Sequence, residues 1–239
     1  MLNFRKSLGL ASIALAAVVS VSQANAEEGS ILPGEFSANI GIFTDYNFRG
    51  FTQTGKDPAI QGGFDWSHET GIYAGVWASN VNFGDGDQAA IEIDAYGGFA
   101  GEAGGLGYDI GFIYYAYPGA ASTLDYNFWE VALSVSADAG PATVSAGVNY
   151  SPENFGDTGE AVYYQLGFAV PLMEKLSFDV NGSYYDVKPA FSPDYFYWNV
   201  GMTYSFEWFD ADLRYHDTDI KGCANLCDTQ VIFGISRSF

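Results

Sequence analysis

The feature that most constrains this chain is an alternation of apolar and polar residues with a period of two. In the segment 36–42 the even positions are apolar and the odd positions are small or polar, and the segments 91–96, 142–150 and 176–181 repeat the pattern. Strict alternation places one kind of side chain on each face of a β-strand. Glycine is common inside these segments and disfavours helix interiors. The sequence therefore predicts an all-β fold.

The alternating segments number about twelve, and most are longer than the strands of soluble proteins, which usually have about 5–6 residues. Strands that cross a bilayer at a tilt need about 9–11 residues. The predicted spans are 36–47, 58–68, 71–82, 90–101, 106–117, 126–137, 141–150, 161–170, 175–186, 195–205, 208–216 and 229–239. Their length favours an antiparallel transmembrane β-barrel.

The links between these segments alternate in length along the chain. Short links lie at 68–71, 138–141, 171–175 and 206–207, and the link at 101–105 is intermediate. Long links lie at 48–57, 82–89, 118–125, 151–160, 187–194 and 217–228. Outer-membrane barrels have an even number of strands, short periplasmic turns and longer external loops. We therefore expect both ends of the barrel sequence on the periplasmic side.

The N-terminus has the three parts of a secretory signal peptide. Arg5 and Lys6 precede an uncharged apolar stretch at 8–21, and Ala24-Asn25-Ala26 follows it. The alternative is an N-terminal membrane anchor, but the apolar stretch is shorter than the roughly 20 residues that a spanning helix needs. The prediction is a signal peptide at 1–26 cleaved after Ala26, a short periplasmic segment at 27–35 and a barrel at 36–239 in a bacterial outer membrane.

The charge balance excludes some partners. The chain has 9 Lys and Arg against 29 Asp and Glu, a formal net charge of −20, and removal of the signal peptide makes it more acidic. Nucleic acids and anionic membrane surfaces both require clusters of basic residues. The composition is nevertheless not that of a disordered acidic chain, because aromatic residues make up 17%. Small solutes or cations are the expected cargo, with no nucleic acid as a partner.

Aromatic residues at the strand ends, and the aromatic residue at the C-terminus, suggest lipids and assembly proteins as further partners. Aromatic residues gather at predicted strand ends, as in the girdles that face the boundary between lipid and water. We expect outer-membrane lipid and lipopolysaccharide around the barrel. The last strand ends on Phe239 and looks like the strand that barrel-assembly machinery reads, although Arg237 departs from the apolar residue usual there. Cys223 and Cys227 are expected to form a disulfide, because exported proteins meet an oxidising compartment.

Parity identifies the residues that should face the interior, since apolar side chains should face lipid. The candidate pore-lining residues are Asp45, Asp65, Glu92, Asp94, Asp109, Glu130, Asp179, Asp210, Asp212 and Arg214. Acidic rings in a pore favour cations, so the prediction is a passive channel with a weak cation preference.

Two alternatives leave the barrel without transport. The inward carboxylates could instead pair with Arg49 and Arg214. A twelve-stranded barrel is also narrower than the barrels of 16–18 strands that hold aqueous channels. Its inward tyrosines, Tyr73, Tyr96, Tyr115, Tyr163 and Tyr185, could fill much of it. A plugged structural or receptor barrel is therefore the main competing hypothesis.

Other classes of function have weaker support. An outer-membrane hydrolase needs a base beside a nucleophile, and the two histidines, His68 and His216, have no Gly-x-Ser-x-Gly motif to work with. Asp217 and Asp219 in the last long link lack the spacing of a calcium loop. We predict no catalytic, metal or cofactor site. A soluble lipocalin-like binder would need fewer strands and a polar outer surface.

A family resemblance covers the mature chain and is densest from Ser37 to Pro118. The run Ser37 to Val81 contains the hairpin signatures Asp45-Tyr46-Asn47-Phe48-Arg49-Gly50 and Gly71-Ile72-Tyr73-Ala74-Gly75-Val76-Trp77, and matching residues continue to Pro118. This string resembles the TorF-type porin family, proteobacterial outer-membrane proteins of unknown function. The resemblance implies an outer-membrane barrel and a pore, and it transfers no catalytic residue.

Overall fold

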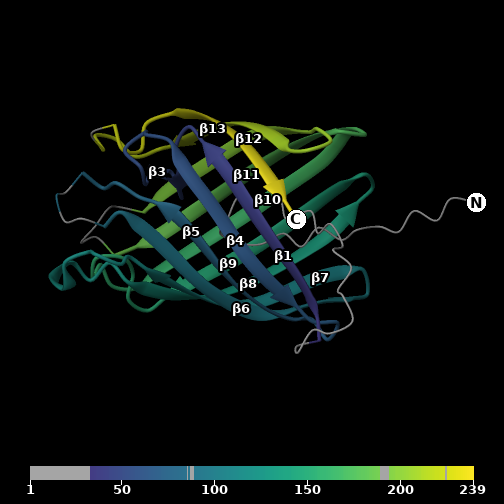
Figure 1. Cartoon of the computed structure of the whole chain (residues 1–239), viewed down its shortest axis with the longest axis horizontal. Coiled ribbons are helices and arrows are strands. Elements are labelled where there is room, and N and C mark those ends of the chain that lie inside the picture. The colour runs from purple at the N-terminus through teal and green to yellow at the C-terminus, as the bar shows by residue number, and fades with distance from the viewer. Residues whose placement is uncertain (1–32, 85, 87–88, 189–193, 224) are drawn as a thin grey trace, which may run out of the picture.

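The computed structural model describes residues 33–84, 86, 89–188, 194–223 and 225–239, and the predicted signal peptide with its cleavage site lies outside them. Twelve strands close into one antiparallel barrel, in the order β1-β14-β13-β12-β11-β10-β9-β8-β7-β6-β5-β4 (Figure 1). The barrel strands are β1 Glu35–Phe43, β4 Ala59–Ser67, β5 Ile72–Asn80, β6 Ile91–Ala103, β7 Leu106–Ala116, β8 Phe128–Ala139, β9 Ala142–Ser151, β10 Ala161–Met173, β11 Leu176–Val187, β12 Tyr195–Ser205, β13 Asp210–Thr218 and β14 Gln230–Ser238. The twelve-stranded all-β prediction is confirmed.

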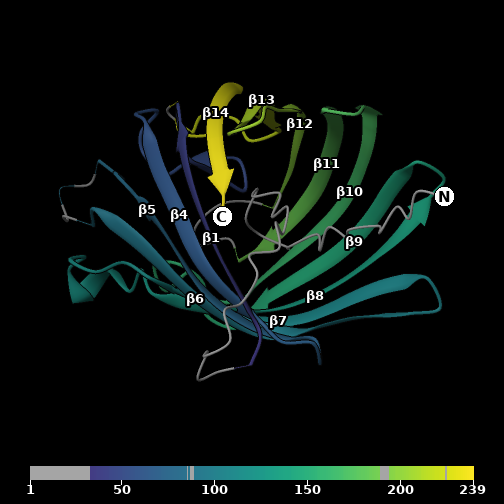
Figure 2. The same ribbon diagram turned by 45° about the vertical axis from the view of Figure 1, so that its right-hand side comes forward.

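The first and last strands close the barrel. β1 pairs with β14 through a register that runs from Asn39 opposite Ser238 to Phe43 opposite Gly234. Figure 2 shows β14 descending beside β1 to the C-terminus, so that the sheet has no free edge. Full closure satisfies the backbone hydrogen bonds that an open edge would leave exposed.

The wall of the barrel is apolar on the outside. The outward residues along each strand are large and apolar, such as Ile40 at 52% exposure and Leu166 at 67%. The inward residues between them are small, polar or aromatic, so the alternation in the sequence is the alternation of the two faces of the sheet. A continuous apolar outer band is the surface of a barrel that faces lipid.

Helices play little part in the described residues. The one helical segment there is the 3-10 turn η1, Ser122–Leu124. None of the described helices has the length and apolar character needed to cross a membrane.

The two ends of the barrel differ, as the link lengths predict. The short turns lie at one end, to the right in Figure 1, and the long links gather at the other. The long link between β1 and β4 also contains a second sheet of two very short strands, β2 Asn47–Phe48 and β3 Phe51–Thr52.

The strand boundaries agree with the predicted spans except at a few ends. β6 and β10 extend further than expected, to Ala103 and Met173. The first strand is shorter than predicted, because it ends at Phe43 and Asp45 already belongs to the following link. The prediction that Asp45 lies on the first strand is wrong: its carboxylate accepts hydrogen bonds from Thr52 and Thr54, and these local contacts turn the chain out of the sheet.

Candidate functional site: the interior of the barrel

The link between β1 and β4 folds across the mouth of the barrel instead of extending outward. Its centre is the hairpin of β2 and β3, in which Asn47 lies opposite Thr52 and Phe48 opposite Phe51. The two residues at the turn, Arg49 and Gly50, have φ values of 49° and 96°. Positive φ at both central residues is the tight hairpin turn whose twist matches the strands. A side chain at Gly50 would collide with the methyl group of Thr218, so glycine is required there.

Arg49, at the tip of this hairpin, contacts the opposite wall of the barrel, which is formed by β8 and β10–β12. Its two terminal nitrogens donate to the two carboxylate oxygens of Glu130 on β8, each at 2.6 Å. Nη1 also donates to Tyr185 Oη on β11 at 3.1 Å, and the guanidinium lies 4.2 Å from the ring centre of Tyr163 on β10. Tyr195 Oη on β12 donates to the backbone oxygen of Arg49 at 2.9 Å. We call Arg49, Glu130, Tyr163 and Tyr185 the Arg49 latch.

The latch is buried and its charges are matched. The side chains of Arg49 and Glu130 are 3% and 1% exposed. Burial alone would lower the pKa of Arg49, but the charge and hydrogen bonds of Glu130 outweigh it and raise that pKa well above its usual value. Glu130 also accepts hydrogen bonds from Asn149 Nδ2 at 2.9 Å and Tyr115 Oη at 3.2 Å. A two-pronged guanidinium–carboxylate pair of this kind fixes direction as well as distance.

The other end of the hairpin is anchored to the near side of the barrel. Tyr46 Oη donates to Glu92 on β6 at 2.8 Å, and its ring packs 5.4 Å from that of Trp77 on β5. Asn47 Nδ2 donates to Gln230 on β14 at 2.9 Å. Burial and the carboxylates of Glu92 and Asp94 raise the pKa of Tyr46 well above its usual value, which keeps the phenol protonated as a donor. The link therefore spans the lumen from β5, β6 and β14 to β8 and β10–β12.

We call the end of the barrel that carries the long links the outer end, and the end that carries the short turns the inner end. Glu92 and Asp94 form an acidic pair at the outer end of β6. Both are inward and almost without exposure, at 1% and 0%. Within the described part of the chain, neither carboxylate oxygen of Asp94 has a hydrogen-bond partner. A buried carboxylate without a partner is costly, so this position favours an added proton, water or cation.

The inner half of the lumen holds two further groups of charges on facing walls. Arg214 on β13 donates to Asp179 at 2.5 and 2.8 Å, to Asn199 at 2.7 Å and to Asp212 at 3.2 Å. Across the barrel, Tyr73 donates to Asp109 at 2.9 Å, and Tyr96 donates to Asp65.

The structure therefore brings the candidate pore-lining residues into three clusters. Glu92, Asp94 and Glu130 lie near the outer mouth with the loop residue Asp45, whereas Asp65 and Asp109 lie further in on one wall, and Asp179, Asp212 and Arg214 on the other. Asp210, the first residue of β13, lines a pocket at the inner rim with Trp208 and Arg237. The alternative in which carboxylates pair with Arg49 and Arg214 holds for Glu130, Asp179 and Asp212.

The residues considered for other chemistry have structural partners. His216 Nδ1 is 2.7 Å from Tyr197 Oη, and His68 Nδ1 is 2.8 Å from Thr70 Oγ1. Asp217 accepts a hydrogen bond from Thr229 Oγ1, and Asp219 accepts one from the backbone nitrogen of Phe196. Across the residues that the structure describes, no group of three or more His, Cys, Asp or Glu could hold a metal ion.

Cys223 and Cys227 are joined by a disulfide in the link between β13 and β14, with their Cα atoms 5.8 Å apart. Leu226, which lies between the two cysteines, contacts the β2–β3 hairpin. Its backbone oxygen accepts a hydrogen bond from the backbone nitrogen of Thr52 at 2.9 Å. Thr218 Oγ1 also donates to the oxygen of Cys227. The disulfide segment therefore contacts both β3 and the end of β13.

Three solved structures of outer-membrane proteins are similar to this chain to different degrees. The NanC porin matches with a TM-score of 0.55 at 10% identity, over 84% of this chain and 97% of that chain. Outer membrane phospholipase A from Escherichia coli gives 0.49 at 12% identity, over 90% and 93%. OmpF from Salmonella typhi, in complex with daunomycin, gives 0.49 at 9% identity, over 86% and 97%. At these identities the NanC likeness establishes a common fold.

Comparison of the sequence with known families identifies the family of this chain. No curated protein sequence matches it. A family model described as "Bacterial protein of unknown function" matches residues 26–239, which include every strand of the barrel. The chain therefore belongs to this bacterial family, Gcw_chp.

Proposed function

We propose that the protein is an outer-membrane β-barrel of the TorF-type porins that admits small solutes, with a preference for cations. The location is supported by the apolar outer band, the closed sheet and the two unlike ends. The signal peptide is cleaved after Ala26, the strand ending in Phe239 is read by barrel-assembly machinery, and lipid and lipopolysaccharide surround the wall. Extraction only with detergent, and a gel mobility that changes on boiling, would test this location.

The acidic pair Glu92 and Asp94 is the observation that carries the cation preference. Glu130 is neutralised by Arg49, and Asp179 and Asp212 face Arg214, but no basic group within 4.0 Å neutralises Asp94 among the described residues. When it is ionised, such a carboxylate in a narrow, low-dielectric passage attracts cations more strongly than the same group in open water.

Reversal potentials across planar bilayers under a potassium chloride gradient test this proposal. The E92Q/D94N variant should lose most of the cation preference of the wild type. The control, E69Q/E174Q, removes the same charge from exposed turns at the other end of the barrel and should keep that preference. Anion preference in the wild type, or an unchanged reversal potential in E92Q/D94N, would refute the assignment.

The Arg49 latch supports a second candidate, a barrel that is closed at rest. The hairpin is tied to both sides of the mouth by buried contacts, which is the arrangement of a plug. In this case the wild type would give no single-channel steps, whereas R49M, which frees the tip, would give them. Steps of equal size in both proteins would refute the closed barrel and show that the latch does not restrict the passage, whereas smaller steps in the wild type than in R49M would show a narrowed passage.

A further inference from the structure

Arg237 lies on the outer wall of the barrel, where its neighbours are apolar. It belongs to the outward row of β14, which also contains Val231, Phe233 and Ile235, all exposed. Its register partner on β1 is the exposed Ile40. The residue therefore places a guanidinium at the inner edge of the band that faces lipid.

The guanidinium is held between two aromatic rings and has no acidic partner among the residues that the structure describes. Its Cζ atom lies 5.1 Å from the ring centre of Trp208 and 4.9 Å from that of Phe239. The ion pairs within 4.0 Å among the described residues involve Arg49 and Arg214, and none involves Arg237. Contact with a ring on each side confines the guanidinium, and its N–H donors remain available to an anion.

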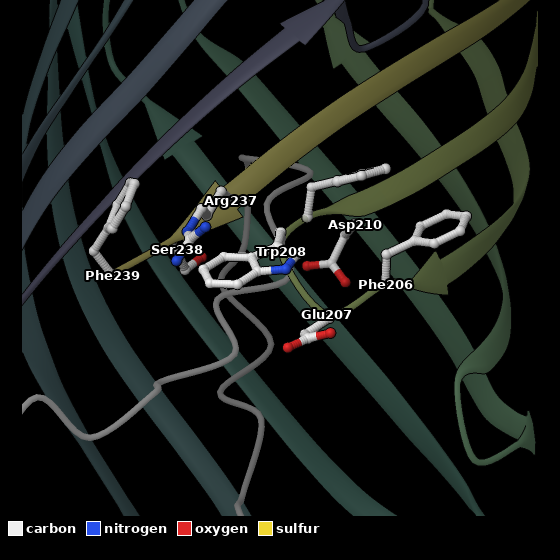
Figure 3. A pocket seen from close by; sticks show the side chains of 8 residues that line it. Phe206, Glu207, Trp208, Asp210, Arg237, Ser238 and Phe239 are labelled. Atoms are coloured by element: carbon white, nitrogen blue, oxygen red, sulfur yellow. The ribbon is translucent and has the colours of Figure 1, made fainter.

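A pocket of about 330 Å³ opens beside this arginine at the inner rim. It is formed by the turn between β12 and β13 and by the end of β14. Figure 3 shows Arg237 on one side of Trp208 and the carboxylate of Glu207 on the other, with Asp210 beside the ring. The exposed rings of Phe206 and Trp208 border the pocket. One hollow thus combines a positive group, negative groups and apolar rings.

We propose that this rim pocket, at the turn between β12 and β13, binds the headgroup of a zwitterionic phospholipid of the phosphatidylethanolamine type. The phosphate accepts hydrogen bonds from the edge of Arg237, because a guanidinium matches two phosphate oxygens. The ammonium group extends past Trp208 to Glu207. The acyl chains follow the apolar row of Ile235 and Phe233 upward along the wall. The site rests on the proposed membrane location but does not depend on transport through the lumen.

Charge complementarity distinguishes this headgroup from the other lipid classes. An anionic headgroup such as phosphatidylglycerol satisfies Arg237 but places no cation near Glu207. A diacylglycerol satisfies neither group. The expected order of affinity is therefore phosphatidylethanolamine, then phosphatidylglycerol, then diacylglycerol.

Native mass spectrometry of the purified barrel in detergent, titrated with each of these three lipids, tests the proposal. R237Q should weaken phosphatidylethanolamine binding about tenfold, the effect of losing a charge-assisted hydrogen bond. E207Q should keep phosphatidylglycerol binding and reduce phosphatidylethanolamine to the same level. The control is K175Q, which removes one exposed positive charge from the neighbouring turn between β10 and β11 and should change nothing.

The results of these titrations test the lipid pocket independently of the channel. Equal binding by R237Q and wild type, or equal loss in R237Q and K175Q, would overturn the pocket. Equal affinity of the wild type for phosphatidylethanolamine and phosphatidylglycerol would overturn the zwitterionic assignment. The channel is tested separately, because R237Q should leave the single-channel conductance and reversal potential of the wild type unchanged.

Discussion

At the scale of single residues, the carboxylates in the lumen differ in their partners more than in their positions. Glu130 accepts hydrogen bonds from Arg49, Asn149 and Tyr115, whereas Asp94 has no partner for either oxygen among the described residues. Both are inward, both are buried and both lie near the outer mouth. Their contributions to stability should therefore have opposite signs.

Matched amide substitutions test this difference. E130Q leaves the buried Arg49 guanidinium without a counter-charge and should reduce the free energy of unfolding by about 3 kcal/mol. D94N replaces a buried carboxyl group that has no hydrogen-bond partner among the described residues and should leave that free energy unchanged or raise it by about 1 kcal/mol. Urea unfolding in detergent micelles, followed by tryptophan fluorescence, measures both. A loss of similar size in the two variants would contradict the assignment of partners.

At the scale of elements, the β2–β3 hairpin is held by contacts that are very distant in the sequence. Arg49 meets residues 81 and 136 positions away. If Glu130 is what holds the tip, E130Q should release the hairpin while the twelve-stranded ladder stays intact. An arginine-specific endoprotease should then cut after Arg49 in E130Q and leave that bond whole in the wild type.

The control for this experiment is D179N, which disturbs the other buried arginine, Arg214, and should leave the bond after Arg49 protected. Gel mobility before and after boiling shows whether the barrel itself survives in each variant. Cleavage after Arg49 in the wild type would show that the hairpin opens without loss of Glu130.

The elements also show what the sequence could and could not predict. Alternation and link length predict the twelve strands and the unlike ends, because both properties are local. Asp45 and Tyr46 have the parity of the polar and apolar residues that precede them at 36–42, so the pattern extends the predicted first strand too far. The sequence does not predict the inward fold of the hairpin, because residues 47–52 have the composition of a polar and aromatic surface loop. Arg49 is a possible partner of the acidic residues, but no local pattern identifies Glu130 as the residue that it binds.

At the scale of the whole molecule, the distribution of side chains is the reverse of that in a soluble protein. Apolar side chains cover the outside of the barrel and charged side chains lie inside it. Such a surface is stable only if lipid covers it, and the cost of a charge on it should depend on depth. A wall that faced water would show no such dependence, because exposed substitutions in water usually have small effects. Depth dependence along one strand is therefore the property that distinguishes a membrane barrel from a soluble one.

Two exposed positions on β10 provide that measurement. Leu166 lies near the middle of the strand and Met173 at its inner end, with exposures of 67% and 70%. L166R should reduce the free energy of unfolding in phospholipid vesicles by about 2–4 kcal/mol, and M173R by about 0–1 kcal/mol, because the cost of arginine falls from the bilayer midplane to its edge. The alanine variants L166A and M173A separate lost side-chain packing from added charge. Equal costs for the two arginines would place the wall in water, since only a lipid layer makes these equally exposed positions different.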